Sequence, residues 1–344
     1  MTHISSKLAL AIGLAFAGWQ TTVLAQSSSA TLFDGYVAAG LPQAFALPRP
    51  ADDERGEGID QVVIEEKLDT DVVFPDGSHA MTYVGTSNGI EATFTRIGDD
   101  LSVSVSDERL EPTVSTGRIR RSAAPEMNDA ITLPPSASTR AFSLTAEPQT
   151  QAPRELQFWI FLHDQSGETN YAKFHNWYIA WWIRDMEHAV KPGIPVKVII
   201  KDHIPGVTDF DYHQAVTSDR SLVKFGNIAD RYLDSAGATP SQITKTMLFV
   251  NDVAANWGDY TYGVALQNNT VAMASGTGPR HIVAHEFGHT LGAAHRYAED
   301  RFPCVTNMMG FITPRYSCRI YTGANDLEIR RHVKEALEAI ERER

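Results

Sequence analysis

The eleven residues from His285 to His295 constrain this chain more than any other stretch, because they follow the pattern H-E-x-x-H-x-x-G-x-x-H. Residues four apart lie on one face of an α-helix, so His285 and His289 can direct their imidazoles at a common point. Gly292 tolerates positive φ, which lets the chain leave the helix in a sharp turn. The pattern therefore predicts a helix and a tight turn that bring three histidines together.

Three converging imidazoles are typical of a catalytic zinc site, in which a fourth position stays open for water. Glu286 follows the first histidine and can take a proton from a zinc-bound water, as a general base does. We therefore interpret His285, His289 and His295 as zinc ligands and Glu286 as the catalytic residue. The competing interpretation is a polar helix with scattered histidines, or an inactive relative of an enzyme.

The pattern resembles the signature of the metzincin zinc endopeptidases, in which a methionine turn follows the same motif. Downstream lies the segment 304–311, which contains Met308-Met309-Gly310. The resemblance implies that Met309, just before Gly310, lies under the zinc, with Met308 as the alternative. An ordinary core methionine is the other interpretation.

The residues around the motif differ from those of several metzincin groups. Arg296 follows the third histidine, and Phe311 stands two residues after Met309, where astacins and serralysins carry a tyrosine. The chain is similar to bacterial reprolysin-like enzymes and also resembles the peptidyl-Asp metalloendopeptidases. Arg296, Arg301 and Arg315 lie near the expected pocket in sequence, and cations there would favour acidic side chains in a substrate.

Residues 1–25 have the features of a secretory signal peptide. Lys7 precedes an apolar run, Leu8–Gly18, and Val23-Leu24-Ala25 fits a cleavage site with small residues. A membrane anchor would need about 20 apolar residues, and no other segment is apolar enough to span a bilayer. We therefore expect a secreted protein, extracellular or periplasmic, without a membrane span.

Residues 26–121 are expected to form a small, mostly β domain, and residues 122–153 a linker. Short β-prone runs in the first segment are separated by Pro, Asp, Asn and Gly turn signals. Pro, Ser, Ala and Thr dominate the second segment. We therefore expect strands in the first segment and a connecting linker in the second.

Charge separates the same two parts of the chain. Residues 1–153 hold 10 basic and 20 acidic residues, a net of −10, and residues 154–344 have a net of −2. We hypothesise that residues 26 to about 153 are a propeptide that assists folding and covers the zinc site. Because this part contains no cysteine, a carboxylate, a histidine or steric cover would have to block the zinc.

Residues 154–344 alternate between strand and helix patterns. They predict an α/β (α+β) catalytic domain with a mixed, mostly parallel twisted sheet and an active-site helix. A hairpin signal at Asn268-Asn269 places an edge strand, 262–267, just before the zinc helix. An extended substrate would pair with this strand through its main chain.

Cys304 and Cys318 are the two cysteines of the chain. In an exported protein such a pair is expected to form a disulfide, which here would brace the methionine turn. A catalytic thiol is the alternative, but the chain offers no histidine–cysteine arrangement that competes with the zinc motif.

These observations predict a secreted zinc-dependent endopeptidase that cleaves extended polypeptide. We expect a protein or peptide substrate, a monomer and no nucleic-acid partner; a structural calcium ion has no support in the sequence. Two other classes stay open: an inactive, metzincin-like binding module, and a zinc hydrolase that acts on a non-protein amide. The sequence does not indicate which peptide bonds would be cleaved.

Overall fold

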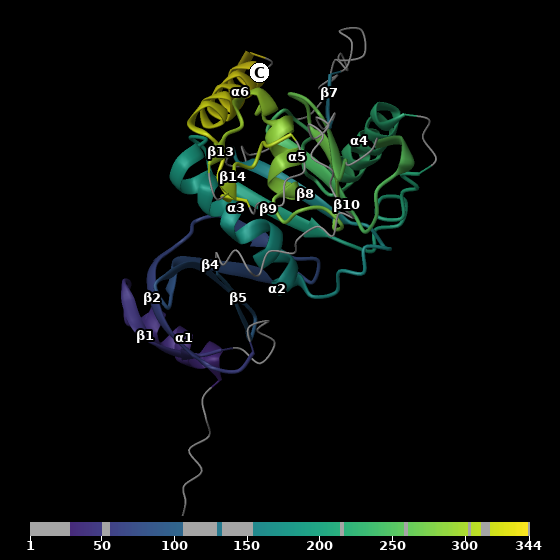
Figure 1. The fold of residues 1–344 in the computed structure, drawn as a ribbon. Coiled ribbons are helices and arrows are strands. Elements are labelled where there is room, and N and C mark those ends of the chain that lie inside the picture. Colours follow the sequence, from purple (N-terminus) through teal and green to yellow (C-terminus); the bar gives the residue numbers. More distant parts are fainter. Residues whose placement is uncertain are drawn as a thin grey trace, which may run out of the picture.

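One twelve-stranded mixed sheet runs through the described part of the computed structural model (Figure 1). The structure describes residues 28–49, 56–105, 129–132, 154–213, 217–257, 261–301, 304–310 and 317–342. The predictions for residues 1–25, Phe311 and Arg315 lie outside these ranges. Among the described helices, none is both long and apolar enough to cross a membrane.

Parallel strands form the centre of the sheet, as the sequence predicts. They are, in spatial order, β9 (Val196–Lys201), β8 (Leu156–Leu162), β10 (Thr244–Val250) and β12 (Val271–Ser275). These strands are largely buried on both faces, which explains their nearly continuous apolar sequences. β11 (Gly263–Leu266) pairs antiparallel with β12 and completes the predicted hairpin. The mixed, mostly parallel α/β fold is therefore confirmed.

Helices cover both faces of this sheet (Figure 1). On one face α5 (Ile282–Thr290) and α6 (Gly323–Arg342) share a core with Phe158 and Phe249. On the other face α4 (Ser218–Ser235) packs against Phe161 and Leu248. Alternate side chains of β8 and β10 thus enter opposite cores, as the strand period requires.

Residues 171–190 form one long helix that is not uniform. It consists of α2 (Tyr171–Phe174), the π-helical turn η2 (His175–Ile179), α3 (Ala180–Asp185) and a second π-helical turn, η3 (Met186–Val190). Asn170 caps its start by accepting a hydrogen bond from the Lys173 amide at 2.8 Å. The aromatic residues that the sequence assigns to the core are largely buried in it.

The N-terminal part forms a meander of antiparallel strands, with one helix packed on it. The strands are β1 (Gln43–Pro48), β2 (Ile59–Lys67), β4 (His79–Ser87), β5 (Ile90–Ile97) and β6 (Asp100–Val105). The helix α1 (Ser29–Ala38) and β1 were not anticipated from the sequence. Phe33 of α1 is fully buried against Tyr83 and Phe94.

Two short strands connect the N-terminal part of the chain to the central sheet. β3 (Asp71–Val73) pairs with β4 on one side and, in parallel, with β9 on the other. β7 (Ala130–Ile131) pairs in parallel with β11 at the opposite end of the sheet. Residues that precede Arg154 therefore contact the central sheet at both of its ends.

Candidate metal centre

The helix α5 and the turn after it have the predicted form. α5 is buried along its whole length and ends at Thr290. Gly292 follows with φ 91°, a left-handed conformation that other residues rarely adopt. A β-carbon at this position would also lie 2.7 Å from Asn268 Oδ1. The glycine therefore allows the reversal that brings His295 back to the helix.

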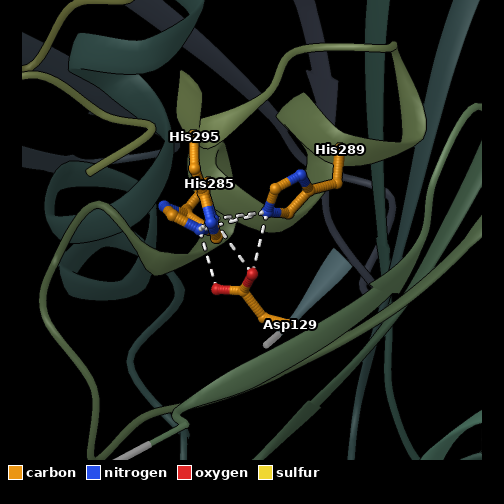
Figure 2. Close-up of side chains that lie close together, drawn as sticks. All are labelled: Asp129, His285, His289 and His295. Carbon is orange, nitrogen blue, oxygen red and sulfur yellow. Dashed lines mark hydrogen bonds and ion pairs between the residues drawn. The ribbon is translucent and has the colours of Figure 1, made fainter. Parts of the chain in front are cut away.

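The three predicted histidines meet at one point (Figure 2). The Nε2 atom of His295 lies 3.1 Å from that of His285 and 3.1 Å from that of His289, and the last two are 3.2 Å apart. Nitrogens bound tetrahedrally to zinc at 2.0–2.1 Å are separated by about 3.3 Å. The spacing of the three nitrogens therefore fits one metal ion.

Hydrogen bonds on the far side of two rings fix where their protons are. Nδ1–H of His285 donates to the Asn307 carbonyl at 2.6 Å, and Nδ1–H of His289 donates to the Ala293 carbonyl at 3.2 Å. Because a carbonyl only accepts, these Nε2 atoms present lone pairs to the centre. Burial lowers the pKa of His289 to about 4, which keeps it neutral. Lone pairs that converge in this way are suited to a cation.

A fourth group at this point is Asp129, from the segment interpreted as a linker. Its Oδ2 lies 2.9 Å from His285 Nε2, and its Oδ1 lies 3.2 Å from His289 Nε2 and 3.0 Å from His295 Nε2. The side chain is only 1% exposed. Asp129 and the histidines form a buried group that could hold a metal ion.

The backbone around Asp129 lies along the strand that was predicted to hold substrate. Ala130 and Ile131 pair with Ala265 and Leu266 of β11 in parallel register. The Ala265 amide donates to the Asp129 carbonyl at 2.9 Å, and the Gln267 amide donates to the Ile131 carbonyl at 2.8 Å. A carboxylate was among the blocking groups expected from the sequence, but nothing in the sequence distinguished Asp129 from other acidic residues.

Glu286 is enclosed in this arrangement. Both of its carboxylate oxygens are buried and have no hydrogen-bond partner among the described residues. Burial and the nearby Asp129 carboxylate raise the pKa of Glu286 well above 4.5. Gly263 of β11 lies directly against it, since a β-carbon there would be 2.4 Å from Glu286 Oε1. The carboxyl is therefore enclosed by the protein and has no access to water.

The segment predicted to form a methionine turn lies against α5 and His295. A β-carbon on Gly288 would lie 2.6 Å from Met308 Sδ, and one on Gly310 would lie 2.6 Å from His295 Nδ1. Met308 belongs to the core beneath α5, and Met309 is also buried. The choice of Met309 as the methionine under the metal stays a prediction.

The predicted disulfide is present and lies beside this turn. Cys304 and Cys318 are bonded, with their Cα atoms 5.1 Å apart. Ser317, next to the bridge, donates its hydroxyl to Asn307 Oδ1 at 3.2 Å. The disulfide therefore braces the residue whose carbonyl orients His285.

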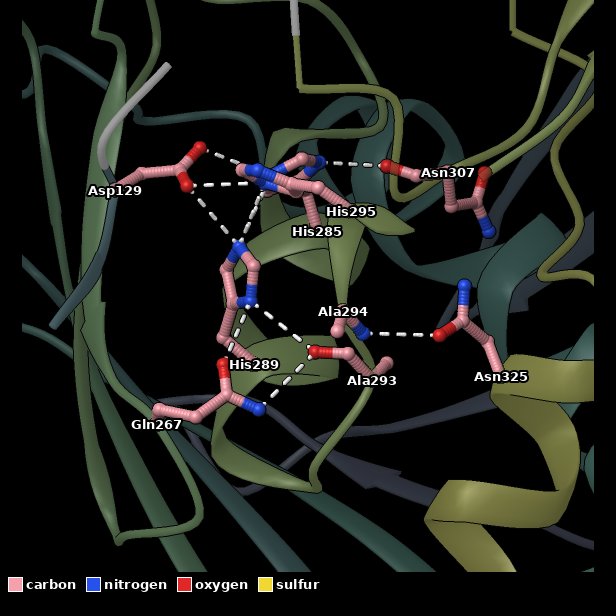
Figure 3. A network of polar contacts seen from close by, with 9 residues as sticks. All are labelled: Asp129, Gln267, His285, His289, Ala293, Ala294, His295, Asn307 and Asn325. Atoms are coloured by element: carbon pink, nitrogen blue, oxygen red, sulfur yellow. Dashed lines mark hydrogen bonds and ion pairs between the residues drawn. The ribbon is translucent and has the colours of Figure 1, made fainter. Parts of the chain in front are cut away.

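Two amide side chains that the sequence analysis did not identify support the ligands (Figure 3). Gln267 accepts a hydrogen bond from His289 Nδ1 at 3.1 Å and donates to the Ala293 carbonyl at 3.2 Å. Asn325 accepts from the Ala294 amide at 2.9 Å. Together they hold the turn between the second and third histidines.

Two arginines that were considered for specificity interact with their own neighbours. The Arg296 guanidinium lies 4.6 Å from the centre of the Tyr297 ring, and Arg301 pairs with Glu299 at 2.7 Å. Among the described residues, neither guanidinium forms a hydrogen bond or ion pair with Asp129 or the three histidines.

A mostly parallel sheet with a buried helix and a histidine–aspartate cluster corresponds to a metalloprotease-like fold. The chain is similar to the crystal structure of metalloproteinase-II from Bacteroides fragilis, with a TM-score of 0.51 and 14% sequence identity. The similarity covers 87% of this chain and 94% of that one. No family model and no curated protein matches the chain. At this identity the likeness concerns the fold.

Proposed function

We propose that this protein is an exported zinc endopeptidase of the metzincin type, produced as a zymogen that Asp129 keeps inactive. The convergence of three Nε2 atoms beside Glu286 carries the proposal, because it provides ligands and a general base for hydrolysis. The fold of the Bacteroides fragilis metalloproteinase supports the same class of enzyme. The sequence pattern of residues 1–25 supports export.

The residues of the chain divide the reaction between them. A zinc ion bound by the three imidazoles would act as a Lewis acid on the scissile carbonyl and on water. Glu286 takes the proton of the attacking water and returns it to the leaving amine. The amides of Ala265 and Gln267, which now donate to residues 129–131, pair with the main chain of an extended substrate.

Asp129 blocks this reaction in two ways. Its carboxylate lies where the fourth ligand of a three-histidine site would be, and its backbone covers β11. Displacement of residues 129–132 would uncover Glu286 and free the amides of β11. The proposed activation step is therefore the removal of this segment from the metal site.

The first test measures cleavage of a denatured protein by the activated wild type and by Glu286→Gln, with bound zinc quantified in both. We expect Glu286→Gln to retain zinc and to lose cleavage by a factor of about 10²–10⁴, because the metal ligands remain and the general base is absent. If the wild type binds zinc but cleaves no protein, the endopeptidase proposal fails. The two other classes, a binding module and a hydrolase that acts on a non-protein amide, then stay open. A panel of cell-wall and glycan amides then separates those two.

The second test concerns Asp129 itself. Without the carboxylate, only the two-residue strand β7 still covers β11, and substrate can displace it. In the uncleaved chain, Asp129→Ala should therefore bind zinc and show activity that the wild type lacks, whereas the exposed Asp234→Ala should stay inactive. If Asp129 is instead a permanent fourth ligand, Asp129→Ala will lose zinc and gain no activity.

A further inference from the structure

The N-terminal part and the Asp129 segment are attached to the catalytic part in different ways. We refer to residues 28–49 and 56–105 as the N-terminal unit. It contacts β9 and the helix that runs from α2 to η3, whereas residues 129–132 contact β11 and the metal site. The two attachments can therefore be considered separately.

The N-terminal unit continues the catalytic sheet. Asp71, Val72 and Val73 of β3 pair with residues 197–199 of β9, and β3 also pairs with β4. Without the unit, β9 would become an exposed edge strand with unpaired backbone groups.

The unit also shares the main hydrophobic core of the catalytic part. Val72 and Phe74 are fully buried in the same cluster as Phe174, Ile183 and Val198. Phe74 stacks on Tyr171 with ring centres 5.7 Å apart. An interface that resembles a domain core divided in two is typical of permanent association.

A carboxylate from the catalytic part anchors the start of β3. Glu187 of η3 accepts hydrogen bonds from the Asp69 amide at 3.0 Å, the Thr70 amide at 2.7 Å and the Thr70 hydroxyl at 2.5 Å. Lys197 of β9 pairs with Asp71 at 2.9 Å. Charge-assisted hydrogen bonds of this kind fix the position of the strand.

A fully buried histidine completes the interface from the π-helical turn η2. Nδ1–H of His175 donates to the Thr95 hydroxyl at 3.0 Å, and Thr95 donates to Asn176 Oδ1 at 2.7 Å. Nε2 accepts from the Thr82 hydroxyl at 3.3 Å. Every polar atom of the ring thus has a partner in the N-terminal unit, and such satisfied networks specify one docking arrangement.

The Asp129 segment is attached through far less apolar surface. Its strand β7 has two residues, both of them only partly buried, and residues 133–153 lie outside the described part. Apart from the Asp129 carboxylate, its backbone contributes the two carbonyls that accept from Ala265 and Gln267.

From this contrast we propose that the N-terminal unit remains bound to residues 154–344 after activation, as the second chain of a two-chain enzyme. Only the segment that carries Asp129 has to leave. The proposal concerns the regulation of the proposed enzyme, but the association itself does not depend on catalysis.

The test uses the full chain with the substitution Glu286→Gln, which prevents self-cleavage. One site for a specific protease is inserted within residues 106–128 and another within 133–153. After complete cleavage at both sites, gel filtration and native mass spectrometry should show the N-terminal unit bound one-to-one to the fragment 154–344. Release of the unit, with the larger fragment soluble alone or aggregated, would overturn the proposal.

A pair of matched variants tests whether the observed interface holds the complex. Glu187→Ala should release the N-terminal unit roughly tenfold faster than the parent, because charge-assisted hydrogen bonds are lost. Glu338→Ala, on the exposed side of α6, should have no effect. Equal release rates in the two variants would contradict the proposed interface.

Activity distinguishes this proposal from the proposed function. Doubly cleaved protein with Glu286 intact should cleave denatured substrate while the N-terminal unit still co-elutes with it. If the complex persists without activity, the endopeptidase proposal fails and the association stands. If activity appears only in a fraction that lacks the unit, the association proposal fails and the endopeptidase stands.

Discussion

At the scale of single residues, Gln267 contacts both the metal site and the strand that covers it. Its side chain accepts from His289 Nδ1 and donates to the Ala293 carbonyl, while its amide donates to the Ile131 carbonyl. These two contacts fix the orientation of the side-chain amide. In the flipped form the Gln267 NH2 group would face the N–H of His289, and its oxygen would face the Ala293 carbonyl. Gln267 therefore holds His289 with Nε2 toward the metal.

Loss of this side-chain amide should weaken metal binding. Gln267→Leu is expected to lower zinc affinity about tenfold, the lower end of the usual range for such partners, because the Ala293 carbonyl still accepts from His289. Competition with a chelator at constant pH measures the change. Gln157→Leu, on β8 and bonded to Trp159, is the matched control. Equal affinities in the two variants would refute the role.

The sequence located the site residues that are close together in the chain and missed those that are far apart. The spacing of His285, His289 and His295 is set by one helix and one turn, so it can be read directly. Asp129 contacts His285 across 156 residues, from a segment without periodicity. Its position depends on the path of the whole chain, which local patterns do not specify.

At the scale of elements, the close approach of β11 to α5 determines where Glu286 lies. Gly263 of β11 faces its carboxyl, and a β-carbon on Gly263 would lie 2.6 Å from Glu286 Cγ and 2.4 Å from Oε1. These distances are shorter than van der Waals contact, so a larger residue must displace the carboxylate or the strand.

Gly263→Ala should therefore reduce catalysis without removing the metal. In the activated protein we expect kcat to fall by about 100-fold, the lower end of the contribution of a general base, with the zinc content unchanged. Gly226→Ala is the control, since a β-carbon on Gly226 of α4 meets only Val271, at 3.4 Å. Similar kcat values for the two variants would show that Glu286 tolerates the displacement.

Long elements with clear periodicity can be identified from the sequence, whereas short or irregular ones cannot. β8, β10 and α4 have the apolar period of strands or helices over many residues, so their sequences identify them. The three-residue strand β3 gains its partner β9 only in the folded chain. The π-helical turns η2 and η3 are not visible in the sequence. Each adds a single residue to a helical turn, which barely changes the spacing of the apolar residues over so short a stretch.

At the scale of the whole molecule, a buried network joins three parts of the catalytic fold. The Tyr321 amide donates to Asp185 of α3 at 2.9 Å, and its hydroxyl donates to the Ala284 carbonyl of α5 at 2.5 Å. Trp182 donates to the same hydroxyl at 3.2 Å. The network thus connects the helix that contacts the N-terminal unit with the helix that carries the histidines.

This network should make stability depend on pH. Burial, together with the nearby Asp326, raises the pKa of Asp185 from 3.8 to about 7. The folded state therefore keeps a proton that the unfolded chain releases above about pH 4. The contribution of Asp185 to the free energy of unfolding is therefore fully present below about pH 4, and it is lost as the pH rises toward and through 7. In the limit the loss is on the order of 4 kcal/mol.

Asp185→Asn should remove this dependence, because an amide can accept the Tyr321 hydrogen bond without titrating. We expect the free energy of unfolding, measured with urea at saturating zinc, to fall less from pH 5 to pH 8 in the variant than in the wild type. Contributions from all other groups are common to both proteins and cancel. The exposed Asp234→Asn should behave as the wild type. If Asp185→Asn shows the full wild-type decrease, the Asp185 carboxyl is ionised in the folded protein throughout this range, and the network does not store the proton.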